Sequence, residues 1–418
     1  MISTFVFSRD AGLKARKKDF CFPDCFNIIS VEWEPLKSIS FLQTAVSWCE
    51  SRNESFFLAC SNQITFPVDF DCNKFLSLIE IAHQKDADVL ICSAVGIDSP
   101  IFTGIPNLYW VNQVLGINCM IIFKNAYNHI LSLPASWEEY FEFSSVLTHK
   151  MIRKMVISPN IINGNDDDFY VASRWGDCGP SIENIYNKKA TYEKIKLETI
   201  KYDFEEYVVP VYIINLQERK DRLQYIVKEF NNRPEFDVNI VPACKHECGA
   251  LGLWLSIRKI ISMAKDKEED VIIICEDDHH FTSAYSKEYL FQQIANGYVM
   301  GADYLNGGGA DFRNALRISE HLYWIEIIRC TQFIIIYKDF YDKILSADFK
   351  ENVLADVMLS DLTVNKMLIY PFVSVQRDFG YSDVTRIFNL NDGRLTRMFE
   401  NAQKRLGYIK QLTEESSY

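Results

Sequence analysis

The chain has 418 residues, of which 48% are hydrophobic and 14% aromatic, and its formal net charge is −12. This composition excludes wholesale disorder, and the length predicts two domains of about 200 residues each. The negative charge argues against a nucleic-acid backbone or an anionic membrane as the main partner, but it allows a small anionic ligand.

The N-terminal sequence and the cysteines indicate a cytoplasmic protein. The chain begins without a basic segment followed by an apolar stretch, so we expect no signal peptide. No window approaches the roughly 18 apolar residues that a transmembrane helix needs. Several of the twelve cysteines lie inside apolar runs, as reduced core thiols do. Cys21 with Cys25, and Cys244 with Cys248, lack the usual spacing of zinc ligands, so structural zinc is disfavoured.

The two halves of the chain share an ordered set of similar segments, whose spacing stays between 212 and 215 residues. The matching segments are Phe57–Cys60 with Ile272–Cys275, Ala87–Leu90 with Ala302–Leu305, Asn107–Trp110 with His321–Trp324, Ile130–Ser132 with Ile344–Ser346, and Lys154–Pro159 with Lys366–Pro371. A period this long is not that of a solenoid. The pattern predicts a duplicated domain.

Apolar periodicity in the second half predicts alternating strands and helices. The predicted strands are Val208–Asn215, Val271–Cys275, Ala302–Leu305 and Cys330–Tyr337. The predicted helices are Gln217–Phe230, Gly252–Ala264, Tyr285–Ala295 and Lys338–Leu345. Such alternation is typical of a mostly parallel α/β sheet covered by helices.

Changes in composition place the domain boundaries. We predict a first domain at residues 1–187, a charged linker helix at 188–206, a second domain at 207–390 and a C-terminal helical tail at 391–418. The tail has apolar residues at helical spacing, namely Leu395, Met398, Phe399, Ala402 and Leu406. We expect this tail to pack or dock rather than to carry chemistry.

The strongest chemical signal is the end of the predicted strand Val271–Cys275, where three carboxylates follow directly, Glu276, Asp277 and Asp278. Open α/β sheets bind ligands at the carboxyl ends of their strands. Neighbouring carboxylates repel one another unless a cation neutralises them. The pattern therefore favours Mg²⁺ or Mn²⁺ that also holds a phosphate-bearing substrate. The alternative is an acidic turn that only caps the next segment.

The repeat allows the two halves to be compared at this point. At an offset of 215 residues, the three acids fall on Ser61, Asn62 and Gln63. Neutral side chains cannot balance the charge of a divalent ion. We therefore predict that the first domain is a degenerate copy without the metal site, and that the second domain carries any reaction.

Five short motifs follow one another in the second half. They are Val211–Arg222, Gly249–Ser256, Ile274–Asp278, Asp361 with Tyr370-Pro371 and Gln376, and Ser382–Val384. In this order they resemble glycosyltransferase family 25, which includes lipopolysaccharide-type and collagen galactosyltransferases. The resemblance implies a GT-A fold, a nucleotide-sugar donor, Mn²⁺ or Mg²⁺, and transfer with inversion at the anomeric carbon. His279, His280 and Ile257 depart from the family pattern.

The resemblance also implies roles for single residues. Asp277 and Asp278 are implied as metal ligands, and Asp361 as the catalytic base with Asp383 second. The residues implied to bind the donor are Asn215, Arg219, Arg222, Gly249, Glu276, Asp277, Gly307 and Gly308. The two arginines follow a strand, where guanidinium groups reach phosphate oxygens. The alternatives are a solvated helix turn for the arginines, an N-cap for Asp361 and a tight turn for the glycines.

We therefore predict two tandem GT-A-like, Rossmann-like α/β domains. The second is expected to be a metal-dependent glycosyltransferase that moves a hexose from a UDP-sugar to a hydroxyl of a glycan or glycoconjugate, as in lipopolysaccharide biosynthesis. One alternative is a metal-dependent nucleotidyl or phosphoryl transferase, although no Gly-x4-Gly-Lys-Ser/Thr loop occurs. The other is a non-catalytic sugar- or nucleotide-binding protein, which the acids of the second half argue against.

Overall fold

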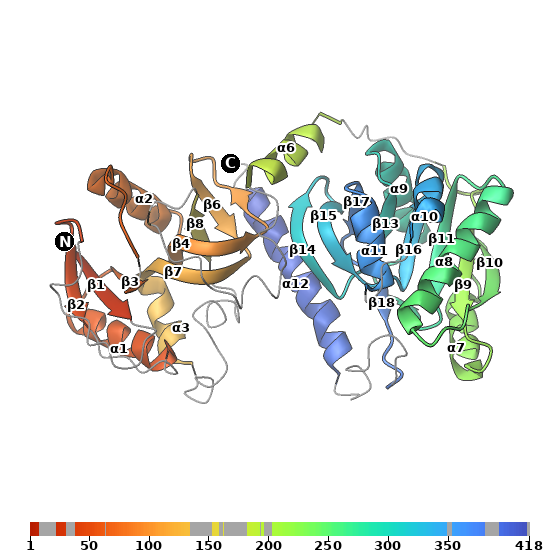
Figure 1. Cartoon of the computed structure of the whole chain (residues 1–418), viewed down its shortest axis with the longest axis horizontal. Coiled ribbons are helices and arrows are strands. Elements are labelled where there is room, and N and C mark those ends of the chain that lie inside the picture. The colour runs from red at the N-terminus through yellow and green to blue at the C-terminus, as the bar shows by residue number, and fades with distance from the viewer. Residues whose placement is uncertain are drawn as a thin grey trace. The chain divides into compact units, whose positions relative to one another are not determined.

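The computed structural model describes residues 1–7, 22–30, 38–62, 64–133, 153–158, 162, 182–192, 194–195, 203–348, 353–380 and 393–415. The chain forms two compact units, one of Met1–Glu183 with Gln411–Tyr418 and the other of Asn184–Lys410. Each unit contains an eight-stranded sheet with helices packed against it (Figure 1).

The sheet of the first unit has the strand order β2-β1-β3-β7-β4-β8-β6-β5. Its strands are β1 (Ile2–Phe7), β2 (Phe26–Ser30), β3 (Phe56–Ser61), β4 (Val89–Asp98), β5 (Ile101–Phe102), β6 (Leu108–Val111), β7 (Gln113–Phe123) and β8 (Lys154–Ile157). The helices are α1 (Ser38–Ser51), α2 (Cys72–Gln84), the short 3-10 helix η2 (Lys124–Ala126) and α3 (Tyr127–Leu131). Apolar side chains of α1 and α3 share one core with Phe5, Phe57 and Met120 of the sheet.

The sheet of the second unit has the strand order β10-β9-β11-β16-β13-β17-β15-β14. Its strands are β9 (Val209–Asn215), β10 (Phe236–Pro242), β11 (Val271–Glu276), β13 (Tyr304–Asn306), β14 (Asp311–Arg317), β15 (Leu322–Arg329), β16 (Phe333–Tyr337) and β17 (Lys366–Ile369). A separate pair is formed by β12 (His279–Phe281) and β18 (Ser374–Gln376). The helices are α7 (Lys220–Phe230), α8 (Gly249–Asp266), α9 (Lys287–Val299), η4 (Lys338–Phe340), α10 (Tyr341–Ser346) and α11 (Ala355–Leu362).

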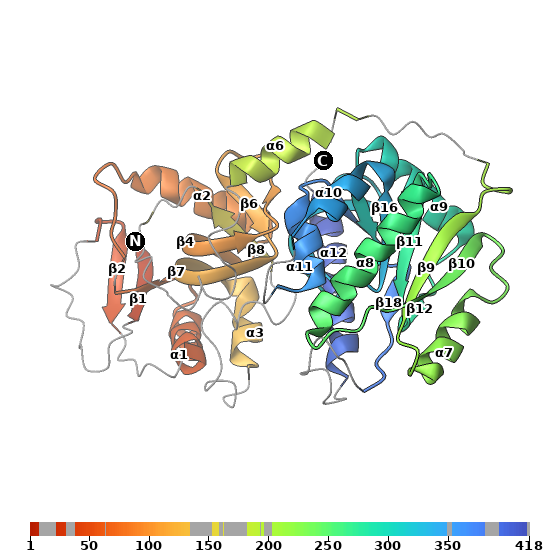
Figure 2. The same cartoon turned by 45° about the vertical axis from the view of Figure 1, so that its right-hand side comes forward.

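Helices cover both faces of the second sheet because its central strands are apolar at successive positions. Val211 and Ile213 of β9 belong to one core with residues of α7 and α9. The alternating residues Tyr212 and Ile214 point to the other face, where α8, α10 and α11 contact one another (Figure 2). The predicted buried strand Val271–Cys275 is confirmed as the greater part of β11.

The second sheet is mixed, so the prediction of a mostly parallel sheet is wrong. Strands β10, β9 and β11 run parallel to one another, and β13 runs parallel to β17. The other neighbouring strands are antiparallel. The reason is that β13, β14, β15 and β16 follow one another without a helix between them, whereas parallel neighbours need a long crossover connection.

The two sheets correspond position by position. Their strand orders show the same succession of parallel and antiparallel neighbours. The registers also agree, since Cys60 lies opposite Cys119 as Cys275 lies opposite Phe333. Helix α2 begins and ends 215 residues before α9. The offsets found in the sequence therefore connect equivalent positions of the two sheets.

Two further helices test the predicted linker and tail. Helix α6 (Ile182–Tyr192) starts earlier and ends sooner than the predicted linker helix, and the chain is not helical at 203–208. Its buried residues Ile185 and Tyr192 are seven positions apart and therefore lie on one face of the helix. The position of the helix follows this apolar face rather than the charged segment 188–206. The predicted tail helix is present as α12 (Arg394–Glu415), with Leu395, Phe399 and Leu406 buried. Among the described residues, no helix is long and apolar enough to cross a membrane.

Candidate active-site cavity

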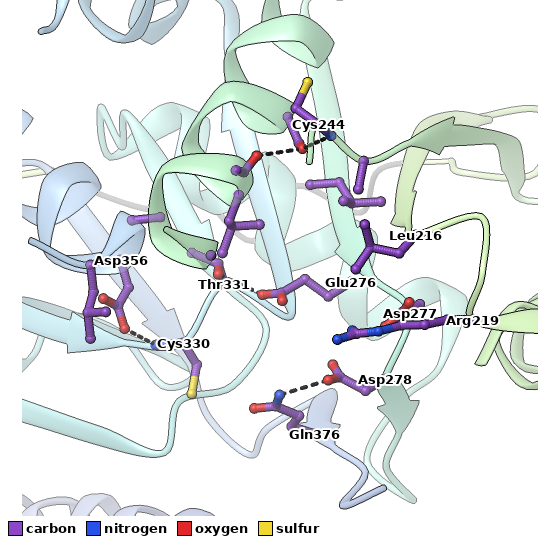
Figure 3. Close-up of a pocket in the computed structure, with 18 of the residues that line it drawn as sticks. Leu216, Arg219, Cys244, Glu276, Asp277, Asp278, Cys330, Thr331, Asp356 and Gln376 are labelled. Carbon is purple, nitrogen blue, oxygen red and sulfur yellow. Dashed lines mark hydrogen bonds between the residues drawn. The ribbon is translucent and has the colours of Figure 1, made fainter. Parts of the chain in front are cut away.

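A cavity opens in the second unit where the parallel strands β9 and β11 end. Its volume of about 1100 Å³ lies above the range of about 300–1,000 Å³ for a pocket with one small ligand. Glu276, Asp277 and Asp278 line it. Figure 3 shows Asp277 and Asp278 near Arg219 on one side of the cavity, Asp356 on the other side, and Glu276 between them with its carboxylate turned to Thr331.

Arg222 of α7 lies between the two aspartates. Its Nη1 donates to Asp277 Oδ1 at 3.1 Å and to Asp278 Oδ2 at 2.9 Å. The three side chains are only 4%, 6% and 7% exposed. Buried charges persist when they are paired and hydrogen-bonded. The guanidinium therefore neutralises part of the negative charge of the carboxylates. The sequence pattern predicts that a metal ion neutralises this charge.

Two amide side chains add to the hydrogen bonding of these aspartates. Asn215, the last residue of β9, donates Nδ2 to Asp277 Oδ2 at 2.8 Å, and Gln376 of β18 donates Nε2 to Asp278 Oδ2 at 2.9 Å. Both oxygens of Asp277 are thus engaged. Asp278 Oδ1 is buried and has no hydrogen-bond partner in the described part of the chain. A buried carboxylate oxygen of this kind is suited to a bound ligand.

Burial and mutual repulsion raise the pKa values of two of the acids. Desolvation, followed by the charge of Asp278, raises the pKa of Glu276 to about 8. The Thr331 hydroxyl donates to Glu276 Oε1 at 2.6 Å and opposes this rise. Desolvation also raises the pKa of Asp278 to about 6, against the favourable charge of Arg222. Burial and the neighbouring carboxylates therefore disfavour the charged form of Glu276 in the protein alone.

The opposite wall of the cavity comes from β15 and α11. Asp356, in the first turn of α11, accepts the backbone N–H of Cys330 at 3.0 Å and that of Val357 at 2.7 Å. Cys330 has a φ of 109°, which is costly for a residue with a side chain and is found mainly at functional sites. Burial raises the pKa of Asp356. Sequence reasoning missed Asp356, although it lies in the same segment as the chosen acid, Asp361.

Asp361, the first acid predicted as the base, is not seen in the cavity. Asp361 belongs to α11 but is exposed and does not line the cavity, and Asp383 lies outside the described residues. Residues five apart on a helix point in directions roughly 140° apart. Asp356 and Asp361 therefore face different sides of α11, and Asp356 lines the wall of the cavity opposite the acidic strand end (Figure 3).

The two glycines predicted to bind the donor contact other parts of the protein instead. Gly307 and Gly308 follow β13 and do not line the cavity. A Cβ on Gly308 would lie 1.9 Å from the carbonyl oxygen of Ser374, and one on Gly307 would lie 2.6 Å from Phe333 Cδ1. The close approach that these glycines allow is therefore to the protein itself.

Cationic groups line the cavity between β9 and α8. These groups are Arg219 and Lys245, and His246 and Gly249, the first residue of α8, also line this side. Lys245 pairs with Glu218 at 2.8 Å, and both side chains are exposed. Exposed pairs contribute little free energy, so Lys245 can exchange Glu218 for an anionic ligand. The free N–H groups of the first turn of α8 add a partial positive charge.

The two histidines after the acids do not line the cavity. His279 is buried, with Nδ1 2.7 Å from Ser374 Oγ and its ring stacked on Phe333. His280 Nδ1 lies 2.9 Å from the Tyr225 hydroxyl and 3.1 Å from Glu229 Oε1. These contacts hold the pair β12–β18 against α7.

The carboxylates of the cavity fit a magnesium or manganese ion only in part. Among the described residues, no group of three or more His, Cys, Asp or Glu side chains is arranged to hold a metal ion. Mg²⁺ needs less, because it is usually held by one or two carboxylates together with waters and substrate phosphates. Asp278 fits this requirement through Oδ1. Asp277 does not, because Arg222 and Asn215 occupy its oxygens.

The described residues thus define an α/β protein with acids and cations gathered in one cavity of its second unit. No protein-family model matches the chain, and no curated protein matches it. Among solved structures it is similar to A197 from STIV, at 14% identity and a TM-score of 0.31, over 42% of this chain and 87% of that one. It is also similar to apo-UDP-glucose pyrophosphorylase, at 10% identity and a TM-score of 0.29, over 53% of this chain and 87% of that one. Likenesses this weak assign no function.

Proposed function

We propose that the second unit is a metal-dependent glycosyltransferase that moves a hexose from a nucleotide sugar, expected to be a UDP-sugar, to a hydroxyl of a glycan or glycoconjugate. The observation that carries this proposal is the meeting of Glu276, Asp277 and Asp278 with Arg219 and Arg222 in one cavity at the end of β9 and β11. A nucleotide sugar leaves as a diphosphate, whose developing charge must be stabilised.

The donor half of the site follows from the charges. Arg219 and Lys245 bind the diphosphate oxygens, and Arg222 keeps Asp277 and Asp278 in place for the donor. Mg²⁺ or Mn²⁺, held by Asp278, supplies positive charge to the leaving diphosphate when bound. Glu276 lies next to this site and binds the ribose of the donor through its carboxyl group.

The acceptor half centres on Asp356. In an inverting transfer, the acceptor oxygen attacks the anomeric carbon on the face opposite the diphosphate and must lose its proton. Asp356 takes this proton as the new C–O bond forms and the bond to the diphosphate breaks. Its burial favours this role, since a raised pKa makes a carboxylate a stronger base. This assignment replaces that of Asp361, which is exposed.

The first unit is, in this proposal, a degenerate copy of the second GT-A-like domain. Support comes from the shared strand order and register of the two sheets. Ser61 ends β3 opposite Phe7 as Glu276 ends β11 opposite Ile214. Ser61 and the following Asn62 supply no carboxylate, so the first unit lacks the acid set on which metal and donor binding rest.

A screen of nucleotide sugars for slow hydrolysis tests the proposal without a known acceptor. The intact chain is expected to release UDP from one UDP-hexose in the presence of Mn²⁺, and Asp278→Asn is expected to abolish this release. Asp342→Asn, an exposed acid outside the cavity, serves as the control with normal activity. Failure to release a nucleoside diphosphate from any nucleotide sugar would overturn the assignment.

The same assay separates transfer of a sugar from transfer of a nucleotide. A nucleotidyl transferase would convert UTP and a sugar phosphate into a UDP-sugar and release pyrophosphate, because attack then falls on the α-phosphorus. The proposed activity releases UDP and no pyrophosphate. Pyrophosphate formation that depends on Asp278 would favour the nucleotidyl transferase.

A further inference from the structure

Arg329 is a cation in the cavity that the proposed chemistry does not use. It is the last residue of β15, it lines the cavity and its side chain is exposed. The residue opposite it on β14 is Asp311, but the carboxylate of Asp311 already accepts a hydrogen bond from Arg405 at 3.1 Å. Among the described residues, no side chain forms an ion pair or a hydrogen bond with the guanidinium of Arg329.

The nearest acid does not hold this guanidinium either. The charge of Arg329 acts on Asp356 and lowers its pKa, against the larger effect of burial. The two oxygens of Asp356 nevertheless accept the backbone N–H groups of Cys330 and Val357. Arg329 is therefore near Asp356 without being paired to it, and its five N–H donors are available to a ligand.

The position of Arg329 assigns it to the acceptor half. It precedes Cys330, which is hydrogen-bonded to Asp356. Figure 3 shows Cys330 and Asp356 together on the side of the cavity away from Arg219. In the proposed function the donor diphosphate has Arg219 and Lys245 on the other side, so a cation beside the base faces the second substrate.

From this geometry we infer that the acceptor carries an anionic group, a carboxylate or a phosphate, close to the hydroxyl that receives the sugar, and that Arg329 binds this group. Arginine suits such a ligand because its planar fork makes two parallel hydrogen bonds to a carboxylate or a phosphate. The acceptor class is therefore an acidic sugar or a phosphorylated sugar rather than a neutral one. This inference rests on the proposed glycosyltransferase function and names the substrate class of the same site.

Matched acceptors test the inference. A neutral methyl hexoside, the corresponding uronic acid and the corresponding sugar phosphate are compared at equal ionic strength, with the UDP-hexose that the wild-type chain hydrolyses. The wild-type chain is expected to use one of the two anionic acceptors with a kcat/KM about 10- to 100-fold above that of the neutral one. Whichever is used identifies the anion as a carboxylate or a phosphate.

Substitutions then connect this preference to Arg329. In Arg329→Gln the preference for the anionic acceptor is expected to disappear through a raised KM for that acceptor. Arg329→Lys should restore part of the preference, because charge is kept but the planar fork is lost. Lys338→Gln, which removes an exposed cation outside the cavity, should leave the preference intact.

The outcomes separate this inference from the proposed function. Equal use of neutral and anionic acceptors by the wild-type chain, or an undiminished preference in Arg329→Gln, overturns the anionic acceptor while donor hydrolysis still supports a glycosyltransferase. Absence of donor hydrolysis in the wild-type chain overturns the proposed function itself. A thermal unfolding midpoint of Arg329→Gln close to that of the wild-type chain shows that the variant is folded.

Discussion

Arg222 and Asp278 form an ion pair at 2.9 Å in which both side chains are almost completely buried. The same guanidinium holds Asp277 at 3.1 Å. Removal of one partner from such an arrangement leaves a charge buried without compensation, which costs far more than the pair contributes as a whole. The ion pair therefore couples the stability of the second unit to the geometry of its candidate site.

Arg222→Met should destabilise the second unit by about 3–5 kcal/mol, because Asp277 and Asp278 lose their counter-charge while they stay buried. Urea unfolding followed by tryptophan fluorescence measures this change. Lys265→Met breaks an exposed pair with Asp342 and should cost no more than about 1 kcal/mol. Equal stabilities of the two variants would show that the aspartates escape into solvent.

Asp356→Asn and Asp361→Asn decide which acid of α11 serves as the base. The first should lower the rate of sugar transfer by about 10²- to 10⁴-fold, as expected for loss of a general base, and should leave binding of UDP unchanged. The second should transfer at nearly the wild-type rate because its side chain is exposed outside the cavity. Transfer rates with the donor at saturation, together with calorimetric titration of UDP, provide both readouts. The reverse pattern would restore Asp361.

The sequence predicts the acidic side of the cavity better than its opposite wall. Glu276 directly follows an apolar strand and Arg222 follows the strand beside it, so both lie at an edge that any parallel pair of strands would share. Asp356 and Cys330 come together only because β15 pairs with β17 and α11 packs against β15. Such non-local pairing leaves no periodic signal in the sequence. Asp356 and Asp361 are aspartates of the same helix, so the sequence alone does not distinguish them.

The prediction of the sheet failed for a related reason. Alternating strands and helices indicate crossovers, but the segment from β13 to β16 contains only strands. Residues Cys330–Gln332 belong to the run predicted as one strand but lie outside any strand, and Cys330 has a positive φ there. The positive φ of a cysteine leaves no signal in the sequence.

Gly308→Ala should destabilise the second unit without changing donor affinity. An added Cβ would lie 1.9 Å from the carbonyl oxygen of Ser374, and a backbone atom cannot yield as a flexible side chain does. Overpacking of this kind costs about 1–3 kcal/mol. Denaturant unfolding measures the stability, and titration of UDP into the folded variant measures the affinity. A weakened affinity with normal stability would instead show that Gly308 approaches the donor.

Lys366 makes the stability of the second unit depend on pH. Burial lowers the pKa of Lys366 to about 8, and its Nζ donates to the carbonyl oxygens of Ser360 at 2.7 Å and Thr363 at 2.6 Å. In the unfolded chain the ordinary pKa of lysine returns, near 10.5. Between these two values the unfolded chain binds more protons than the folded one, so the free energy of unfolding rises with pH.

A comparison with Lys366→Met isolates the contribution of Lys366 to the pH dependence of the free energy of unfolding. The free energy of unfolding of the wild-type chain minus that of the variant should rise from pH 8 to pH 9.5, by at most about 1.4 kcal/mol per pH unit. Lys338→Met, at an exposed lysine, should show no such trend. Lys154 occupies the equivalent position of the first sheet, and burial lowers its pKa to about 8 as well, so Lys154→Met should show the same trend for the first unit. A difference that stays constant with pH, or falls, would mean that Lys366 keeps an ordinary pKa because water reaches its ammonium group.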